Sequence, residues 1–358
     1  MLLNYEYEQR LPVAFIGAGD HAYRNILPCL QYAPVDLVAL ADYDRERGMA
    51  VARQFGARHF YPNYKALLSK EKVEAVFIVL GPDEQGRPRY TEVGAEAIEA
   101  GFHTWIDAPP CADKGDINHF TNACLKTRKY IVTGFKRMFA PAYLKVAEII
   151  ADPAFGGATS FVMRYPVYLP SKEEQGQPLN RLAFLQFVHP YSLLVRLFGE
   201  CESFCYVRNR QTGGAMITFT YRNGLVGTLH LTAGQAMSGP LERLEVIGNG
   251  ANVVVENAVR LIYYRAGGAR GAEGEERSGT FIGPNDAAPI IWEPEFSLGQ
   301  LYSKQIVLEG YASSVIYFAQ QLLQGEPPKY GNLVDMMHIM GTLSNLLDGK
   351  EKEWLTPY

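Results

Sequence analysis

The stretch VAFIGAGDHA, residues 13–22, decides the fold of this chain. Apolar residues run into a glycine, and apolar residues at helical spacing follow over 22–32, which predicts a strand that turns tightly into a helix. Apolar runs and helical segments keep alternating as far as residue 133. This alternation is typical of a parallel sheet that helices cover on both faces.

The turn itself fits the pattern G-x-G-x-x-A, with Gly17, Gly19 and Ala22 at the fixed positions. In such a turn the first glycine permits the backbone conformation, the second lets the backbone approach a pyrophosphate, and the small third residue lets the helix pack against the sheet. Asp20 and His21 stand at the start of the helix, where backbone amides bind phosphates. The turn therefore predicts a dinucleotide-binding site. The alternative is a turn that contains glycine for steric reasons alone.

An acidic residue stands where such a site needs one. Asp42 ends the second apolar run, at about the 20-residue distance from the turn at which a carboxylate binds the adenosine ribose. An acid there repels a 2′-phosphate, so the expected coenzyme is NAD. Arg45 and Arg47 follow closely and leave NADP open. If the turn is only structural, Asp42 would only cap the next helix.

The pattern of the sequence changes after residue 155. Short runs rich in β-branched and aromatic residues follow one another at close spacing, joined by turn signals such as Asn-Gly. They predict a large, mostly antiparallel sheet, and helical patterns accompany it over 140–151, 182–198 and 310–324. The glycine-rich, charged segment 266–279 predicts a mobile surface loop.

We therefore predict an α/β plus α+β protein of two domains. Residues 1–133 would form a Rossmann-type doubly wound parallel sheet that binds a dinucleotide, and residues 134–358 an α+β domain with an open sheet for substrate binding and oligomerisation. With 358 residues, of which 47% are hydrophobic, the chain can fill two cores. An open apolar sheet face is unfavourable in water, so we expect it to pack against a second copy in a homodimer or homotetramer.

Composition narrows the class of protein further. The formal net charge is -4 and the basic residues are scattered, which argues against a nucleic-acid partner. No apolar stretch reaches the ~18 residues of a spanning helix, so no membrane partner is expected. The five cysteines are an odd number, and no secretory signal precedes them, so we expect a cytoplasmic protein with reduced thiols. The histidines have no metal-ligand spacing, and we expect no metal.

Four longer segments resemble the glucose-fructose oxidoreductase/inositol dehydrogenase/MocA (Gfo/Idh/MocA) family, and the resemblance covers nearly the whole chain. AVFIVLGP (75–82) and AGFHTWIDAPP (100–110) are similar to the family's fourth and fifth strands. GFKRMFAPAYLK (134–145) is similar to the segment that leads into the substrate domain, and LAFLQFVHPYSLLVRLFG (182–199) to the helix with the catalytic histidine. The resemblance implies an NAD(P)-dependent oxidoreductase that acts on a sugar, a polyol or a related carbonyl or imine.

The resemblance also implies a pocket between the domains, with the nicotinamide at the carboxyl ends of the parallel strands. Leu80 and Gly81 follow the fourth strand, and Asp107 and Ala108 end the fifth. We expect these four residues to contact the coenzyme. His189 coincides with the family's catalytic histidine.

Two departures from the family concern its proton relay. The family has Glu-Lys-Pro after the fifth strand, where this chain has Asp107-Ala108-Pro109. It also has an aspartate one turn before its histidine, where this chain has Leu185. Oxidation of a carbinol needs a proton acceptor within hydrogen-bond reach, so His189 would have to act without either group.

Gln186 and Ser192 lie three residues from His189 on either side and could fix its tautomer. The other interpretation of His189 is a histidine that only packs in the core.

Four further residues are candidates for the substrate site. Lys136 follows the sixth apolar run between aromatic residues, where desolvation could turn it into a replacement base. Arg137 is a candidate for substrate binding, although one of the two adjacent side chains should point away. Tyr165 and Tyr168 could also reach the substrate. The alternatives are a solvent-facing lysine and tyrosines that only pack.

The missing lysine and aspartate keep two other functions open. One is a catalytically silent protein that binds NAD and a small molecule as a sensor or partner-binding protein. The other is an enzyme that holds NAD tightly for a transient oxidation within a net elimination, hydrolysis or epimerisation of a sugar.

Overall fold

The computed structural model describes residues 6–236, 238–265, 288–293, 304–349 and 352–356. The first sheet has six parallel strands in the order β3-β2-β1-β4-β5-β6, as predicted for a Rossmann-type domain. The order reverses between β1 and β4, which is where such sheets bind their ligands. The strands are β1 (Leu11–Ile16), β2 (Val35–Ala41), β3 (His59–Tyr61), β4 (Ala75–Ile78), β5 (His103–Asp107) and β6 (Ile131–Gly134).

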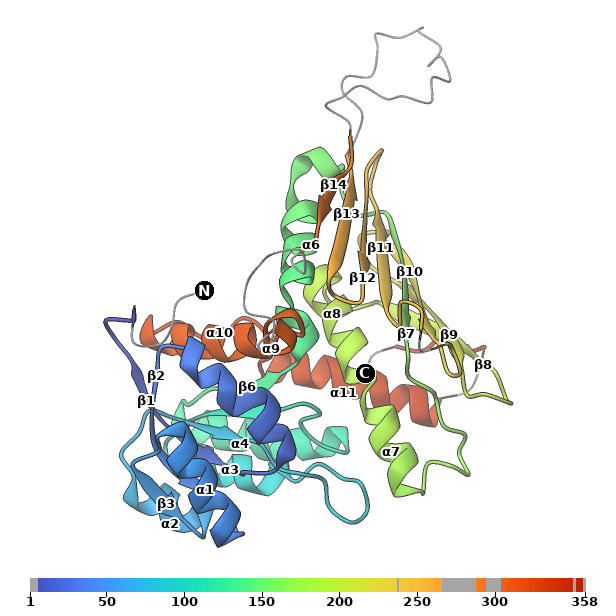
Figure 1. Ribbon diagram of the computed structural model, residues 1–358. Helices are drawn as coiled ribbons and strands as arrows, with labels where there is room; N and C mark the ends of the chain where they lie inside the picture. The colour runs from blue at the N-terminus through green and yellow to red at the C-terminus, as the bar shows by residue number, and fades with distance from the viewer. Residues whose placement is uncertain (1–5, 237, 266–287, 294–303, 350–351, 357–358) are drawn as a thin grey trace, which may run out of the picture.

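The helices of this first part alternate with its strands along the chain (Figure 1). Gly101, at a φ of 94°, adopts the left-handed conformation just after the third α-helix, as is common at helix C-termini. The helices are α1 (Arg45–Phe55), α2 (Tyr64–Lys70), α3 (Tyr90–Glu99) and α4 (Ile117–Thr127), with a 3-10 turn η4 (Lys114–Asp116) before the last.

The segment after β1 differs from the prediction of an α-helix over 22–32. It is a π-helical turn η2 (Ala22–Ile26) followed by a 3-10 helix η3 (Leu27–Tyr32). Pro28 has no N–H to donate to the carbonyl of Arg24 four residues earlier, so a regular α-helical hydrogen-bond ladder cannot continue through it.

The second sheet has eight strands in the order β14-β13-β12-β11-β7-β10-β9-β8. All neighbours pair antiparallel except β7 and β10, which confirms the predicted, mostly antiparallel sheet. The strands are β7 (Ser160–Tyr165), β8 (Ser203–Arg208), β9 (Ala215–Thr220), β10 (Val226–Leu231), β11 (Arg243–Ile247), β12 (Asn252–Glu256), β13 (Arg260–Tyr264) and β14 (Ile290–Trp292). The predicted loop over 266–279 lies outside the described residues.

Helices of the second part cover one face of this sheet. Phe198 stacks on Phe161 of β7 with ring centroids 4.8 Å apart, and Tyr191 stacks on Phe219 of β9 at 5.6 Å. The helices that follow β6 along the chain, including those that do not contact this sheet, are α5 (Lys136–Phe139), α6 (Pro141–Ala151), α7 (Pro178–Leu185), α8 (Val188–Phe198), α9 (Lys304–Leu308), α10 (Tyr311–Leu323) and α11 (Leu333–Asp348), with a 3-10 turn η5 (Pro153–Phe155) after α6.

The predicted single helix over 182–198 is divided into α7 and α8. Pro190 cannot donate to the carbonyl of Gln186, and the amide of His189 donates to that oxygen instead at 3.1 Å. This shift of partner breaks the α-helical ladder just before His189. Proline in the first turn of α8 fits, because amides there have no partner within the helix.

Helix α10 returns from the end of the chain to the first sheet and lies across it (Figure 1). Trp105 of β5 donates its indole N–H to Ser314 at 3.2 Å, and Phe318 packs edge-on against Phe77 at 5.5 Å. The division at residues 133 and 134 stays a proposal. No helix in the described ranges combines the length and the apolar character that a bilayer crossing needs.

Candidate functional site

The glycine turn after β1 has the geometry that its sequence predicts. Gly17 has a φ of 103°, and a Cβ there would lie 2.0 Å from the carbonyl oxygen of Val79, so no other residue fits. At Gly19 a Cβ would meet nothing within 4 Å, because the residue faces an open cleft. Ala22 is buried against the sheet. The turn therefore leaves free space above its second glycine, where a pyrophosphate would bind.

The cleft has a volume of about 1020 Å³ and extends along the carboxyl ends of β1, β2 and β4. This volume is of the order found for small-molecule sites. Leu80 and Gly81 line it, as expected from the sequence. Other lining residues come from loops and from the first turn of α1: Tyr43, Arg47, Asn63, Asp83, Arg89 and Asp113.

Asp42 lies buried at the edge of this cleft, where β2 ends. Its Oδ2 accepts a hydrogen bond from the amide of Ala18 at 2.6 Å, and its Oδ1 accepts from the amide of Asp44 at 2.8 Å. Arg47 also donates to Oδ1, at 2.7 Å. A carboxylate has about four acceptor positions, so Asp42 keeps one for a ribose hydroxyl. Asp44, rather than Asp42, caps the following helix through the amide of Arg47.

His21 and Asp107 form an ion pair across the crevice, with His21 Nε2 at 2.9 Å from Asp107 Oδ2. The side chain of His21 is half-exposed and that of Asp107 is buried. Burial lowers the pKa of His21. The hydrogen bond and the charge of Asp107 together raise this pKa by more than burial lowers it, so the net shift is upward. Ala108 follows at the same strand end and is half-buried. Asp20 points to solvent.

Lys136 and Arg137 both belong to one network of ion pairs. The Lys136 ammonium lies 2.7 Å from Glu309 and 3.1 Å from the hydroxyl of Tyr311. The buried Arg137 guanidinium pairs with Glu242 at 2.9 Å and with Glu309 at 3.2 Å. Neither side chain points away from the cluster, contrary to the expectation for one of them. Lys136 is paired with the carboxylate of Glu309 and does not lie among apolar groups alone, which does not suit a base made by desolvation.

His189 lies at the start of α8 close to this network and is buried. Burial, reinforced by the charges of Lys136 and Arg137, holds the pKa of His189 well below its usual value. Its Nδ1 has no hydrogen-bond partner among the described residues. Ser192 donates to the backbone carbonyl of His189 at 2.9 Å, so it does not fix the ring as the sequence suggested. The result is a neutral imidazole with a free nitrogen.

The two candidate tyrosines lie in different surroundings. Tyr165 is buried next to Arg137, and burial raises the pKa of its phenol. Tyr168 packs over Gly213 and lies near the ion pair of Glu174 and Arg208. The structure therefore brings Tyr165, but not Tyr168, into the charged network.

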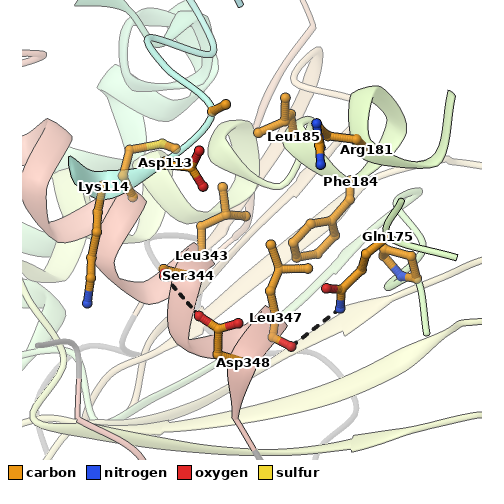
Figure 2. A pocket seen from close by; sticks show the side chains of 13 residues that line it. Asp113, Lys114, Gln175, Arg181, Phe184, Leu185, Leu343, Ser344, Leu347 and Asp348 are labelled. Atoms are coloured by element: carbon orange, nitrogen blue, oxygen red, sulfur yellow. Dashed lines mark hydrogen bonds between the residues drawn. The ribbon is translucent and has the colours of Figure 1, made fainter. Parts of the chain in front are cut away.

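Leu185, which the sequence resemblance aligns with the family's aspartate, lines a small pocket between α7 and α11 with a volume of about 170 Å³ (Figure 2). Phe184 and Leu343 lie beside it in Figure 2. The pocket shares Asp113 with the larger cleft. This position is thus apolar, and the side chain of Leu185 offers no proton acceptor.

Three residues of the network were not predicted from the sequence: Glu242, Glu309 and Tyr311. Each lies more than 100 residues from its partner along the chain, with separations of 105 residues for Glu242 and 173 for Glu309. Among the described residues, no group of three or more His, Cys, Asp or Glu side chains is arranged to hold a metal ion.

The fold and the cleft define a protein with two sheets, of which the first is of a dinucleotide-binding type. Residues 11–135 match the model of the oxidoreductase family with an NAD-binding Rossmann fold, Gfo/Idh/MocA. The matched segment contains all strands of the first sheet. This segment is thus similar to the NAD-binding Rossmann domain of the Gfo/Idh/MocA oxidoreductases, as its sequence suggested.

Similar proteins include the D-xylose 1-dehydrogenase (NADP(+)) 2 of Haloferax volcanii, which is 23% identical over 155 residues, 43% of this chain and 46% of the relative. The chain thus spans slightly less than half the length of that curated relative. A dehydrogenase from Chromobacterium violaceum has a TM-score of 0.75 at 18% identity, covering 95% of this chain and 94% of its own. An oxidoreductase from Agrobacterium radiobacter, solved with NAD+, L-tartaric acid and magnesium, has a TM-score of 0.76 at 13% identity, covering 98% and 99%. At these identities the structures show a shared fold over nearly the whole chain.

Proposed function

We propose that the protein is an NAD(P)-dependent oxidoreductase that transfers a hydride between nicotinamide and a sugar, a polyol or a related carbonyl or imine. The observation that carries this proposal is one cleft that combines the glycine turn with the buried carboxylate of Asp42. The sugar-related activity in the name of the Haloferax relative supports the substrate class.

The residues around the cleft fit a dinucleotide. The amides of Asp20 and His21 would hold the pyrophosphate above Gly19, and Asp42 would accept a ribose hydroxyl. Leu80 and Gly81 would flank the middle of the coenzyme, and Asp107 and Ala108 its nicotinamide end. When bound, the nicotinamide would supply or accept the hydride.

The charged network at the same strand ends would serve the substrate. His189, as a neutral imidazole, would accept a hydrogen bond from a substrate hydroxyl at Nδ1, which is buried and has no partner among the described residues. Lys136 would act as an ammonium that donates to a substrate oxygen or stabilises negative charge on it. Arg137 and Tyr165 would line the substrate side. Tyr168 is a more remote candidate because it lies outside the network.

The first test is coenzyme binding, which is measured by fluorescence transfer from the protein to NADH. We expect NADH to bind about tenfold or more tightly than NADPH, because the Asp42 carboxylate repels a 2′-phosphate. Arg47 already pairs with Asp42 and reduces this repulsion, so NADPH should still bind, although more weakly than NADH. Oxidation of NADH by a panel of keto sugars, or reduction of NAD by sugars and polyols, then tests turnover. Failure of both coenzymes to bind would contradict the proposal.

The absence of the family's lysine and aspartate favours two alternatives to be tested on the same samples. A silent NAD-binding sensor or partner protein would bind coenzyme and turn over no carbohydrate. An enzyme with tightly held NAD would convert a sugar without net consumption of added coenzyme.

We also propose a homodimer or homotetramer formed through the open face of the second sheet, and a cytoplasmic location. Val162, Met216 and Val226 project from neighbouring strands on that face with exposed fractions of 55%, 46% and 47%. Such a face gains free energy when a second copy covers it. Light scattering should therefore give a mass of two or four chains. A single species of monomer mass would argue against this assembly.

A further inference from the structure

His21 and Asp107 meet in the half of the crevice that lies away from Asp42. His21 follows the glycine turn after β1, and Asp107 ends β5 beyond the point where the strand order reverses. A dinucleotide with its adenosine ribose at the end of β2 and its pyrophosphate on the turn carries its nicotinamide toward the ends of β4 and β5. The pair therefore lies where the redox-active ring would bind.

Both ring nitrogens of His21 have a partner. Nε2 lies 2.9 Å from Asp107 Oδ2, and Nδ1 lies 3.0 Å from the amide nitrogen of Asn25. Because a carboxylate only accepts, the neutral ring donates from Nε2 to Asp107 and accepts from Asn25 at Nδ1. An added proton enters at Nδ1, and Asn25 can then turn its amide oxygen toward it. The ring can thus change its charge and keep both contacts.

The surroundings of His21 combine one strong acceptor with opposing charges. Asp107 favours the imidazolium, whereas Lys136 disfavours it and is itself neutralised by Glu309. The ring of Tyr311 lies edge-on at 5.7 Å between centroids. Four titratable groups that face His21 come from other elements: Asp107 of β5, Lys136 of α5, His189 of α8 and Tyr311 of α10. A fifth, Asp20, is its neighbour in the chain.

We propose that the His21-Asp107 pair is the proton store of the coenzyme site, which holds a proton beside a reduced nicotinamide and releases it beside an oxidised one. An oxidised nicotinamide ring is cationic and repels an imidazolium, and a reduced ring is neutral. Lys136 is already paired with Glu309, and His189 is buried among positive charges. Both are poorly suited to keep an additional proton. This inference deepens the proposed function and rests on it.

The proton balance of the reaction agrees with this role. Oxidation of a carbinol to a carbonyl releases a hydride from its C–H bond, which the nicotinamide would accept when bound, and a proton from its O–H bond. His21 would take up that proton at Nδ1 and become an imidazolium paired with Asp107. In the reverse direction the same group returns the proton to the alkoxide oxygen.

Proton release on coenzyme binding tests the inference without any substrate. The full-length protein is titrated with NAD+ and with NADH by calorimetry between pH 6 and 8.5, in two buffers with different ionisation enthalpies. We expect NAD+ to release close to one proton at the acidic end and NADH to release none. By linkage the affinity for NAD+ should rise by up to about tenfold per pH unit below the pKa of His21, while the affinity for NADH stays level.

The variants His21→Gln and Asp107→Asn should each remove the difference between the two coenzymes. His59→Gln is the matched control, because His59 forms a similar pair with Glu71 at 2.8 Å on the far edge of the same sheet, and it should release protons like the unmodified protein. Binding of NAD+ without proton release, or release that persists in His21→Gln, would overturn the inference and leave the proposed function standing. If neither coenzyme binds to the unmodified protein, both fall.

Discussion

Replacement of Gly17 by alanine is expected to abolish coenzyme binding and to lower the free energy of unfolding by about 3 kcal/mol or more. The new Cβ would lie 2.0 Å from the carbonyl oxygen of Val79, on a backbone with a φ of 103°. Neither side can move easily. The amide of Gly17 donates to Ala41 at 2.8 Å, and the amide of Val79 donates to Ile16 at 2.9 Å, so both segments are fixed by the sheet.

Gly19→Ala separates this steric effect from binding. A Cβ at Gly19 meets no protein atom within 4 Å, so the midpoint of urea unfolding should stay close to that of the unmodified protein. The same Cβ projects from a residue that lines the cleft, so NADH affinity should fall by about tenfold or more. If Gly17→Ala unfolds at the midpoint of the unmodified protein, the steric argument for Gly17 is wrong. If Gly19→Ala binds NADH normally, the turn does not hold the pyrophosphate as described.

The alternation of apolar runs and turns was sufficient to predict both sheets, because each strand carries its own local signal. The departures come from prolines and one glycine. Pro28 and Pro190 remove amide donors, so the segments around them are π-helical, 3-10 or divided, although their apolar spacing is helical. Helix α11 was not predicted, and Gly341 in its middle weakens the local helix signal while its burial supports the helix in the fold.

The two halves of the candidate site also differ in how far the sequence predicts them. The coenzyme half is local in sequence, since the glycine turn and Asp42 belong to adjoining strands and obey a fixed spacing. The ion pairs of the substrate half join segments from α5, the start of β11 and the segment before α10. A charged residue alone does not reveal its partner along the chain, so the sequence suggested Lys136 as a free base and missed Glu309. Burial of Arg137 could not be inferred either.

The pair of Arg137 and Glu242 is the most deeply buried ion pair of this network, with exposed side-chain fractions of 7% and 5%. Removal of water from two charges is costly, and their attraction offsets this cost only while both are present. Glu309 contacts Arg137 from a more exposed position, with 26% of its side chain accessible. It can therefore compensate only part of a loss at Glu242.

Glu242→Leu should lower the free energy of unfolding by about 3 kcal/mol, at the lower end of the range for a broken buried pair, because Glu309 remains. The double variant Arg137→Met with Glu242→Leu should recover most of this loss, since no buried charge is then left without a partner. Urea unfolding of the two single variants, the double variant and the unmodified protein forms the cycle. Equal destabilisation in the double and single variants would mean that packing around Glu242, rather than the uncompensated charge of Arg137, determines the stability of this region.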